Sequence, residues 1–337
     1  MKICVVGAGA IGGMLGAKLA LLGGHEVTLI ARGPHLKAIQ DHGLKLIMDE
    51  GTEHVADNVT ATSDMSACGK QDLVILGLKA HQIPPVVDEI CTLVGKHSVV
   101  LTTQNGLPWW YFQRHGGPHD GKSLKMLDPQ GELTAKIDPE KIVGCIAYPA
   151  AEIIEPGVIK HVEGIRFPIG ELDGSTTERA EQISSMFVDA GFKSPVVENI
   201  RSEIWLKAWG NLTFNPISAL THATLVDICQ FPQSRQLAEQ MMTEAQAVAH
   251  KLDITFRVPL EKRINGAERV GKHKTSMLQD VEAGKPLEVD ALVGSVVELG
   301  ELTETPTPAI RAIYAACKLL NRMITDDKLR VRSESFN

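Results

Sequence analysis

Three glycines near the start of the chain constrain its fold more than any other feature. They form the pattern G-x-G-x-x-G over residues 7–12, after an apolar strand pattern at 2–6 and at the start of a helical pattern at 11–22. In a dinucleotide-binding turn, the first glycine permits the tight turn, the second lets the backbone approach a pyrophosphate, and the third lets the helix pack closely on the strand. A second strand pattern at 26–30 completes such a unit, whereas a plain glycine turn in another α/β fold is the alternative. We expect the phosphates of a dinucleotide to contact Gly7, Ala8, Gly9, Ala10, Ile11 and Gly12.

The end of the second strand indicates which dinucleotide would bind. An NAD site usually has an Asp or Glu there, about 20 residues past the last glycine, to bind the ribose 2′-hydroxyl. This chain reads Leu-Ile-Ala-Arg over residues 29–32, with no acid. The planar, permanently charged guanidinium of Arg32 suits a 2′-phosphate. We therefore predict NADP rather than NAD, the alternative being that Arg32 is a solvated surface residue.

Length and charge exclude several classes of protein. The chain of 337 residues is long enough for two domains. Its net charge of −7 provides no basic excess to neutralise phosphates, so we expect no nucleic-acid partner. No apolar run reaches about 18 residues, so we expect no membrane span. The strand pattern at 2–6 leaves no room for a cleavable signal.

Cysteines and histidines show no metal or disulfide pattern. The six cysteines are scattered without a C-x-x-C pair and are typical of a protein in a reducing compartment, so we predict a cytoplasmic protein. The twelve histidines have no spacing typical of metal ligands, and we expect no metal.

The first half of the chain alternates strand and helix patterns. Continuous apolar runs are typical of strands in a parallel sheet that helices cover on both faces. The patterns predict strands at 2–6, 26–30, 72–78, 98–103, and near 143–149, 157–162, 165–170 and 195–198. They predict helices at 11–22, 34–42, 81–94 and 176–191.

From about residue 200 the strand patterns end. Helical patterns follow at 200–221, 232–252, 258–270, 273–283, 288–302 and 306–324. This change predicts an α/β fold: a Rossmann-type parallel-sheet domain at 1–199 that binds NADP, and an all-α domain at 200–337 with the catalytic and substrate-binding residues. The polar tail at 326–337 is expected to fray.

The helix predicted at 200–221 has an unusual polar stripe. Lys207, Asn211 and Asn215 follow each other at four-residue spacing, so they span an arc of only about 80°. The rest of that helix is apolar and therefore predicted to be buried. Buried amides and ammonium groups need polar partners, which makes the stripe a candidate ligand site. A structural hydrogen-bond network between helices is the alternative.

Further polar candidates lie at strand and helix ends. Lys79 and Asn105 each follow the carboxyl end of a predicted strand, where ligands of open α/β sheets bind. An exposed loop lysine and an Asn-Gly turn are the alternatives. We also expect Ala150, after the strand-like piece at 143–149, to contact the cofactor. Ser276 and Glu288 would mean little alone, since a helix start favours a carboxylate anyway.

These segments together resemble the ketopantoate reductase (2-dehydropantoate 2-reductase) family, over most of the chain. The matching residues lie in 7–12, Arg32, 78–82, 104–106, 199–216 and 276–290. The resemblance implies that Lys207 is the general acid and that Glu288 helps to position the reacting groups. It implies that Asn211, Asn215 and Ser276 bind substrate and that Arg32, Lys79 and Asn105 bind NADPH.

The chemistry of the residues agrees with this implication. Hydride delivery to a ketone creates an alkoxide, so an ammonium beside that oxygen stabilises the charge and donates a proton. A carboxylate such as Glu288 near Lys207 would orient the ammonium and keep it charged. Two Asn residues and a Ser offer neutral donors and acceptors for a hydroxyl and a carboxylate.

Three departures from the family pattern affect substrate identity. A segment at 113–140, rich in Gly, Pro, Asp and Lys, is longer than expected and has the character of an excursion or lid. It follows four aromatic residues, Trp109–Phe112, and we hypothesise that Trp109 or Trp110 faces the substrate; the alternative is that the rings bury the base of the insertion. Residues 224–228 replace an Asn-Gly-Glu-Leu type of stretch, and His273 stands where the family often has a substrate-binding Asn.

We therefore predict a cytoplasmic, NADPH-dependent reductase of a small 2-oxo acid, with ketopantoate as the leading substrate. A bulkier 2-oxo acid is one alternative. A non-catalytic NADP(H)-sensing protein is another, but a sensor would need none of Lys207, Asn211 and Glu288. The apolar helical half is compatible with a homodimer.

Overall fold

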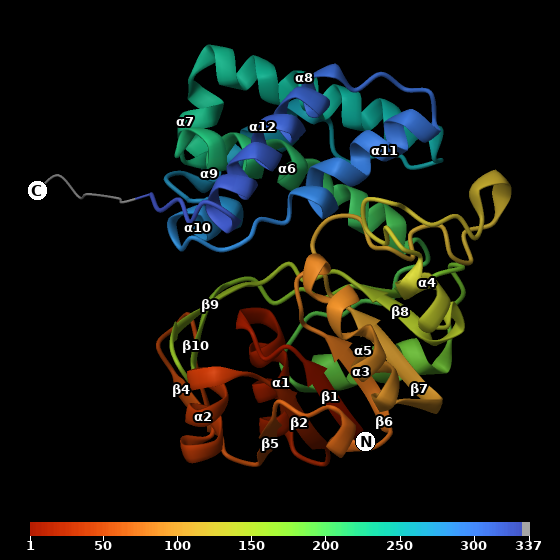
Figure 1. Cartoon of the computed structure of the whole chain (residues 1–337), viewed down its shortest axis with the longest axis vertical. Coiled ribbons are helices and arrows are strands. Elements are labelled where there is room, and N and C mark those ends of the chain that lie inside the picture. The colour runs from red at the N-terminus through yellow and green to blue at the C-terminus, as the bar shows by residue number, and fades with distance from the viewer. Residues whose placement is uncertain (332–337) are drawn as a thin grey trace, which may run out of the picture. The chain divides into compact units, whose positions relative to one another are not determined.

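The chain forms two compact units, which are described separately (Figure 1). The computed structural model describes residues 1–331. The first unit consists of Met1–Gln104, Trp109–Ser123 and Asp128–Glu203, and the second consists of Asn105–Pro108, Leu124–Leu127 and the chain from Ile204 onward. For the tail predicted to fray, residues 326–331 form no helix or strand, and the remainder lies outside the described residues.

A seven-stranded sheet forms the centre of the first unit. Its strand order is β11-β8-β7-β6-β1-β2-β5, and all neighbours are parallel except β11, which is antiparallel to β8. The central strands are apolar on both faces because helices cover both faces. The strands are β1 (Lys2–Val6), β2 (Glu26–Ile30), β5 (Val59–Thr62), β6 (Gln71–Leu76), β7 (Val94–Thr102), β8 (Ile142–Cys145) and β11 (Ile169–Glu171).

A second, four-stranded sheet packs on the other side of the first helix. Its order is β4-β3-β10-β9, with β3 (Leu44–Ile47), β4 (Glu53–Ala56), β9 (Ala150–Glu155) and β10 (Val158–Glu163). The helix α1 (Ala10–Leu22) lies between the sheets: a Cβ on Gly16 would overlap Leu29 of β2, and one on Gly13 would overlap Ile159 of β10. Small residues therefore let one helix serve as the shared core of both sheets.

The remaining helices of the first unit are α2 (Gly33–His42), α3 (Val87–Leu93), α4 (Glu132–Lys136) and α5 (Glu178–Asp189). Of these, α2 and α5 follow the predicted positions, α3 is shorter than predicted, and α4 was not predicted. The helix predicted at 81–94 is two 3₁₀ turns followed by α3, because Pro84 and Pro85 lack the N–H that an α-helix needs. The strand predicted at 195–198 is reduced to an isolated bridge between Ile169 and Val196.

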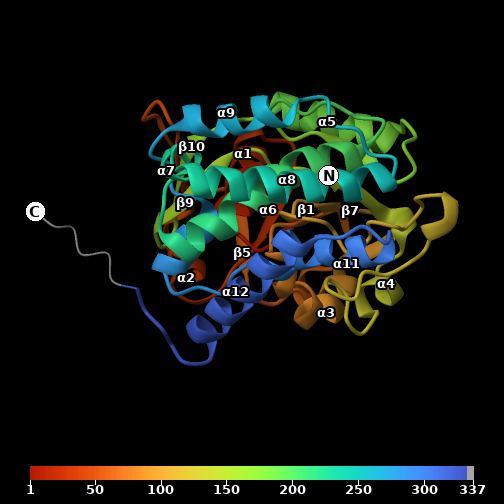
Figure 2. The same ribbon diagram turned by 90° about the horizontal axis from the view of Figure 1, so that it is seen from above.

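The second unit is helical. Its helices are α6 (Ile200–Thr221, whose first turn belongs to the first unit), α7 (Leu225–Gln230), α8 (Pro232–Lys251), α9 (Leu260–Val270), α10 (Ser276–Glu282), α11 (Ser295–Leu302) and α12 (Pro308–Thr325), with a π-helical turn at Asp290–Gly294. Within this unit α8 packs against α7, α9, α11 and α12 (Figures 1 and 2). A parallel-sheet domain followed by a helical domain confirms the predicted fold class.

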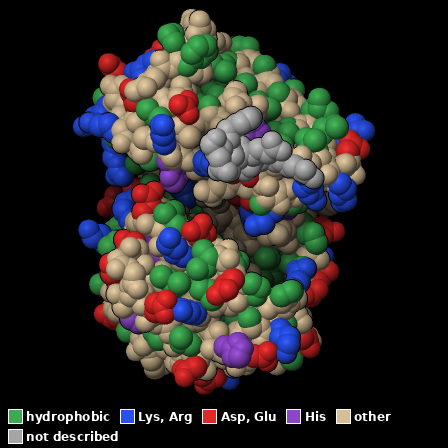
Figure 3. All heavy atoms as spheres, turned by 90° about the vertical axis from the view of Figure 1, so that its left-hand side faces the viewer, with side chains coloured by type: hydrophobic (Ala, Val, Ile, Leu, Met, Phe, Trp, Pro, Cys, Tyr) green, Lys and Arg blue, Asp and Glu red, His purple; other side chains and the backbone are tan. Residues whose placement is uncertain are grey.

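No helix among residues 1–331 combines the length and the apolar character that a bilayer span requires. On the face drawn in Figure 3, acidic, basic and apolar side chains are interspersed.

Candidate functional site

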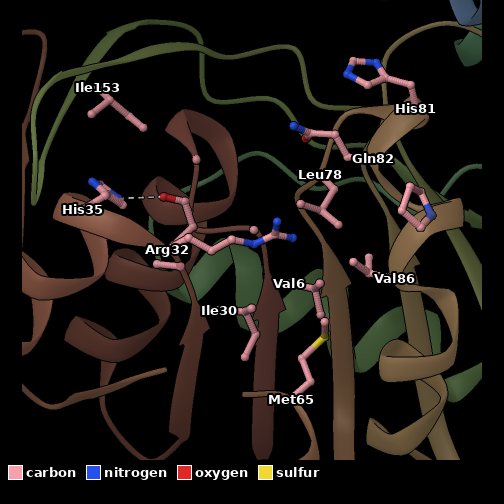
Figure 4. A pocket seen from close by; sticks show the side chains of 15 residues that line it. Val6, Ile30, Arg32, His35, Met65, Leu78, His81, Gln82, Val86 and Ile153 are labelled. Carbon is pink, nitrogen blue, oxygen red and sulfur yellow. Dashed lines mark hydrogen bonds between the residues drawn. The ribbon is translucent and has the colours of Figure 1, made fainter. Parts of the chain in front are cut away.

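A pocket of about 450 Å³ lies in the first unit at the carboxyl ends of β1, β2 and β6 (Figure 4). Open α/β sheets bind their ligands at this edge. The pocket is lined by Val6, Gly7, Ala8, Gly9, Ile30, Ala31, Arg32, His35, Met65, Leu78, His81, Gln82, Pro85, Val86 and Ile153.

The glycine-rich loop forms one wall of the pocket. The backbone N–H groups of Gly7 and Ala8 donate to the carbonyl of Ile30 over 3.2 and 2.9 Å, which fixes the turn on the end of β2. A Cβ on Gly12 would overlap the carbonyl oxygen of Gly7, so only glycine lets α1 start this close to β1. Gly9 precedes α1 without any side-chain cap, which leaves N–H groups of the first helical turn available for an anion.

Arg32 supplies the positive charge of the pocket. It is the residue before α2, and its side chain extends into the pocket (Figure 4). No Asp or Glu is among the lining residues, so nothing there would repel a 2′-phosphate. The arrangement suits NADP for the reason predicted from the sequence.

Several other predicted cofactor residues do not line the pocket. Lys79 starts the 3₁₀ turn Ala80–Gln82, and its backbone N–H donates to Oε1 of Gln82 over 3.0 Å. Gln82 lines the pocket while Lys79 does not. Ala150 starts β9 and is likewise outside the lining, although Ile153 of the same strand belongs to it. Ala10, Ile11 and Gly12 form the first turn of α1 rather than the pocket wall.

The sequence analysis missed several pocket residues. They include His35 of α2, Met65 of the loop that follows β5, and Ile153 of β9. Their approach to the glycine loop depends on contacts between distant parts of the chain. His35 alone had a local signal, since it lies one turn after Arg32 on the predicted helix.

In the second unit, Lys207 pairs with Asn105. Nζ of Lys207 donates to Oδ1 of Asn105 over 2.7 Å, and both side chains are half-buried. Hydrogen bonds from an ammonium are among the stronger ones, so this bond restricts where the ammonium points. The structure therefore brings together two of the residues that the sequence singled out, although they lie far apart along the chain.

A close backbone contact holds Asn105 in place. Gly106 has a φ of +79°, and a Cβ there would overlap the carbonyl oxygen of Ala291 and lie 2.5 Å from its carbonyl carbon. The N–H of Leu107 donates to the same carbonyl over 3.0 Å. Ala291 belongs to the π-helical turn Asp290–Gly294, and such turns are frequent at functional sites because they redirect backbone groups.

The π-helical turn is held by side chains around it. Oδ1 of Asp290 accepts from the hydroxyl of Tyr314 over 2.8 Å, and its carboxylate pairs with Lys318 over 3.0 Å. Burial is the larger cause that raises the pKa of the Tyr314 hydroxyl, and the Asp290 carboxylate is the next. One turn further on, the carboxylate of Glu298 accepts from the backbone N–H groups of Lys125 and Met126 over 2.7 and 2.9 Å. Glu288, the predicted positioning carboxylate, lies two residues before the turn and is half-buried.

The predicted substrate residues lie on α6 and α10. Asn211 is half-buried and Asn215 is buried, one and two turns after Lys207. The other side of α6 is anchored by Trp209, whose ring stacks on Phe256 at 4.1 Å and whose indole N–H donates to the carbonyl of Met242. Ser276 is exposed at the first position of α10. Lys207 and Asn211 therefore lie on a less packed side of an otherwise buried helix, whereas Asn215 is buried.

Arg263 of α9 is a cation near this stripe that the sequence analysis did not identify. A Cβ on Gly210 would lie 2.9 Å from Cζ of Arg263, so the absent side chain at Gly210 makes room for the guanidinium. Gly210 is three residues after Lys207 and directly precedes Asn211. A permanent positive charge therefore lies against the same helix as the candidate acid.

The aromatic run Trp109–Phe112 lies in the core of the first unit. All four side chains are buried, and the indole N–H of Trp110 donates to Oγ1 of Thr102 over 3.0 Å. This is the alternative that we weighed, in which the rings bury the base of the insertion. The insertion itself contains α4 and buries Leu124, Leu127, Leu133 and Ile137, so it is better packed than its composition indicated.

A buried arginine fixes this run to the first turn of α6. Arg201 donates from Nε to the carbonyl of Tyr111 over 2.7 Å, from Nη2 to that of Gln113 over 2.9 Å, and from Nη1 to that of Leu172. Burial lowers the pKa of its guanidinium. Two positions later, Glu203 accepts a bidentate pair from Arg166 and the hydroxyl of Tyr148. Arg201 and Glu203 of the matched motif therefore hold the helix rather than a ligand.

Comparison with known proteins identifies the family. Residues 3–174 match the family described as Ketopantoate reductase PanE/ApbA, and residues 199–321 match its C-terminal part. The chain belongs to the ketopantoate reductase family. A protein of Mesorhizobium japonicum named 2-dehydropantoate 2-reductase is 50% identical over 95% of this chain and 98% of its own length. A protein of the same name from Pyrococcus abyssi is 31% identical over 94% of this chain and 97% of its own length.

Solved structures of this family have the same fold. A candidate ketopantoate reductase from Ralstonia solanacearum has a TM-score of 0.91 and 38% identity over 96% of this chain and 98% of that one. The 2-dehydropantoate 2-reductase of Geobacter metallireducens has a TM-score of 0.83 and 26% identity over 95% of this chain and 99% of that one. Ketopantoate reductases are NADP-dependent oxidoreductases that use NADPH, in agreement with the Arg32 prediction.

The residues present fit that cofactor. The pocket combines an uncapped helix start, a glycine loop and an arginine, which are the groups that a phosphorylated dinucleotide needs. Among residues 1–331, no group of three or more His, Cys, Asp or Glu is arranged to hold a metal ion.

Proposed function

We propose that this chain reduces ketopantoate to pantoate with NADPH, the reduction step of pantothenate biosynthesis. The observation that carries the proposal is the bond from Nζ of Lys207 to Oδ1 of Asn105 at 2.7 Å, because it holds a proton donor in a fixed direction. The full-length relationship to a protein of Mesorhizobium japonicum that is named for this reaction supports the choice of substrate.

The proposed chemistry needs one proton donor and one source of charge stabilisation. Bound NADPH supplies the hydride, which adds to the carbonyl carbon of the 2-oxo acid. The carbonyl oxygen gains negative charge as its π bond breaks, and the Lys207 ammonium stabilises this charge and transfers a proton to the oxygen. The products are a 2-hydroxy acid and NADP⁺, and Lys207 regains its proton from solvent. Asn105 keeps the ammonium directed during this step, and Glu288 has a positioning role.

The substrate groups are assigned to α6, α9 and α10. Asn211, Asn215 and Ser276 offer hydrogen bonds to the hydroxyl and carboxylate of the substrate. The guanidinium of Arg263 provides a cation of the kind that binds a carboxylate in two places. A bulkier 2-oxo acid stays an alternative because of His273, but the buried aromatic rings of Trp109 and Trp110 give it no support.

Turnover of the Lys207→Ala variant tests the proposal. We expect wild-type protein to oxidise NADPH with ketopantoate in preference to a panel of 2-oxo acids of different bulk. Lys207→Ala should lower kcat by about two orders of magnitude or more while the Kd for NADP⁺ stays similar. Loss of NADP⁺ binding would instead make Lys207 a structural or cofactor-binding residue. No turnover of any 2-oxo acid by wild-type protein would favour the NADP(H)-sensing alternative.

Cofactor choice is assigned to Arg32. Only NADPH carries the 2′-phosphate, and a hydrogen bond to a charged group contributes about 1.5–3 kcal/mol, so Arg32→Ala should weaken NADPH binding roughly ten- to 150-fold. The binding of NADH should change little. Equal losses for both cofactors would contradict the assignment.

We place the protein in the cytoplasm. All six cysteines are free thiols, and a reducing compartment keeps cysteines in that state. Finding the tagged chain in an oxidising compartment of its native cell would contradict this placement.

We also propose that the chain forms a homodimer through α12. The exposed side of this helix carries an apolar stripe of Ala312, Ala315, Ala316, Leu319 and Met323 beside a row of the basic residues Arg311, Lys318 and Arg322. Leu319 is 59% exposed. In an antiparallel two-fold pair, Leu319 would meet the partner's Ala316 and Met323 would meet the partner's Ala312, which matches large residues with small ones. Light scattering should give a dimer for the wild type and a monomer for Leu319→Glu; a monomeric wild type would contradict the proposal.

A further inference from the structure

His35 lines the pocket, but both of its ring nitrogens are engaged by the protein. Its Nε2 lies 2.8 Å from the carbonyl oxygen of Ala8 in the glycine-rich loop, and this bond is drawn in Figure 4. Its Nδ1 lies 3.0 Å from the backbone nitrogen of Gly157 in the turn between β9 and β10. The ring therefore joins α2 to two segments that are distant in sequence, and it has no nitrogen left for a phosphate.

The two partners determine the protonation of the ring. A carbonyl oxygen only accepts, so Nε2 of His35 carries a hydrogen. A backbone N–H only donates, so Nδ1 must present its lone pair to Gly157. His35 is thus a neutral imidazole with its hydrogen on Nε2, a state that does not attract the 2′-phosphate as a cation would.

The bond to Ala8 controls the peptide that faces the phosphates. The N–H of Ala8 donates to the carbonyl of Ile30 over 2.9 Å, while its own carbonyl accepts from His35, so this residue is held on both sides. In a trans peptide the C=O and the following N–H point in opposite directions. Fixing the Ala8 carbonyl therefore also fixes the direction of the N–H of Gly9, the residue that starts the uncapped end of α1.

The bond to Gly157 ties the turn after β9 to the same ring. Gly157 accepts from the N–H of Lys45 of β3 over 2.9 Å, so the turn is already anchored in the second sheet. The strand β9 that leads into this turn carries Ile153, a pocket residue. The β9–β10 turn is thus a rigid support against which His35 holds the glycine loop.

We propose that His35 is a positioning residue for dinucleotide binding. It orients the Ala8–Gly9 peptide toward the pyrophosphate and makes no contact of its own with the 2′-phosphate. The inference rests on the proposed function only in requiring that the pocket binds a dinucleotide. It separates two nearby residues: Arg32, directly before α2, distinguishes NADP from NAD, whereas His35 on α2 supports both equally.

Titration calorimetry with NADP⁺ and NAD⁺ tests this role. His35→Ala should raise the Kd of both nucleotides by the same factor, about three- to tenfold, which corresponds to the loss of one hydrogen bond. Arg32→Ala should raise the Kd of NADP⁺ alone. His42→Asn, on the exposed last turn of the same helix, is the matched control and should change neither Kd.

Two conservative variants separate positioning of the loop from general structural support. The amide of Gln reaches about as far as Nε2 and can still donate to Ala8, while the shorter Asn can only replace Nδ1 toward Gly157. Each variant keeps one of the two bonds, so a purely structural role predicts similar Kd values for both. The positioning role predicts that His35→Gln binds both nucleotides more tightly than His35→Asn and that His35→Asn resembles His35→Ala.

Three results would overturn the inference. They are unchanged binding by His35→Ala, a loss confined to NADP⁺, and equal losses in the Gln and Asn variants. Failure of the wild type to bind either nucleotide would instead refute the proposed function, so the two failures are distinguishable.

Discussion

Replacement of Gly106 by alanine should lower turnover without affecting the nucleotide pocket. The added Cβ would lie 2.5 Å from the carbonyl carbon of Ala291, whereas ordinary contacts begin at 3.4 Å. The loop must therefore retreat by about 1 Å, since the opposing atoms are backbone and cannot turn aside. Such a shift would lengthen the 2.7 Å bond between Lys207 and Asn105 beyond the range of a hydrogen bond.

The size of the loss follows from that bond. A hydrogen bond to a charged group contributes about 1.5–3 kcal/mol, which corresponds to a fall in kcat of roughly ten- to 150-fold. A displacement of about 1 Å at a reacting group is known to cost about a hundredfold, in agreement with this range. The assay is steady-state oxidation of NADPH with ketopantoate at saturating NADPH, so that a change in cofactor binding through Asn105 does not enter the measured kcat.

A matched glycine controls for backbone strain. Gly51 also has a positive φ, +89°, but a Cβ there would meet nothing within 4 Å. Gly51→Ala should therefore show only the cost of the left-handed conformation, about 1–2 kcal/mol of stability, and retain full turnover. Full turnover by Gly106→Ala, or an equal loss in both variants, would refute the argument that the Ala291 contact positions Asn105.

Two further predictions concern the first turn of α6. Arg201→Met should lower the free energy of unfolding by about 3 kcal/mol or more, because three buried carbonyls lose their donor. Urea denaturation measures this loss, and the control Arg269→Met, at an exposed position, should be about as stable as the wild type. Equal stability of the two variants would contradict the prediction. Burial, and next the adjacent Glu203, raise the pKa of the Tyr148 hydroxyl from an ordinary value of 10.0 to about 12. The stabilising contribution of the neutral hydroxyl is therefore complete below about pH 10 and is lost as the pH rises toward 12. Tyr148→Phe should accordingly flatten the decline of the urea midpoint above about pH 10, and an unchanged slope would exclude Tyr148 as its source.

The parts of the fold that local patterns determine could be predicted. The β1–α1–β2 unit is specified within about 30 residues by its glycines and apolar runs, and β1, α1, β2 and α6 occur within one residue of their predicted bounds. Of the second sheet only β10 was predicted as a strand, at 157–162, whereas β3, β4 and β9 were missed because they are four to six residues long and partly exposed. Its order also depends on pairing β3 with β10, more than a hundred residues later.

The helix α7 shows a signal that was present but not used. Thr224 and Asp227 form a capping box, in which the carboxylate of Asp227 accepts from the N–H of Thr224 over 2.9 Å. A Thr followed three residues later by an acid is typical of a helix start. The segment was noted only as a departure from the family pattern, although its local chemistry indicated a helix.

In the candidate site, too, residues that act locally could be predicted, whereas partnerships between distant elements could not. Gly7, Gly9 and Arg32 could be placed from sequence because each acts next to its own strand end. The partnership of Lys207 with Asn105, and that of His35 with Gly157, could not be placed, since each joins elements whose distance depends on tertiary packing. The roles assigned to the individual site residues stay predictions.

The π-helical turn at Asp290–Gly294 makes this part of the chain sensitive to changes in length. A π-helical turn holds one residue more than the α-helix would need, so loss of one residue there would restore a regular helix. Five residues at the π-helical spacing turn through about the same angle as four residues at the α-helical spacing, so the residues beyond the turn would keep their faces, and Glu298 could still accept from Lys125 and Met126. The Ala291 carbonyl, in contrast, would return to the helix ladder instead of meeting Leu107. Substitutions that preserve length are therefore open to this segment during divergence, whereas a single-residue deletion would remove the carbonyl that anchors the Asn105–Gly106 turn.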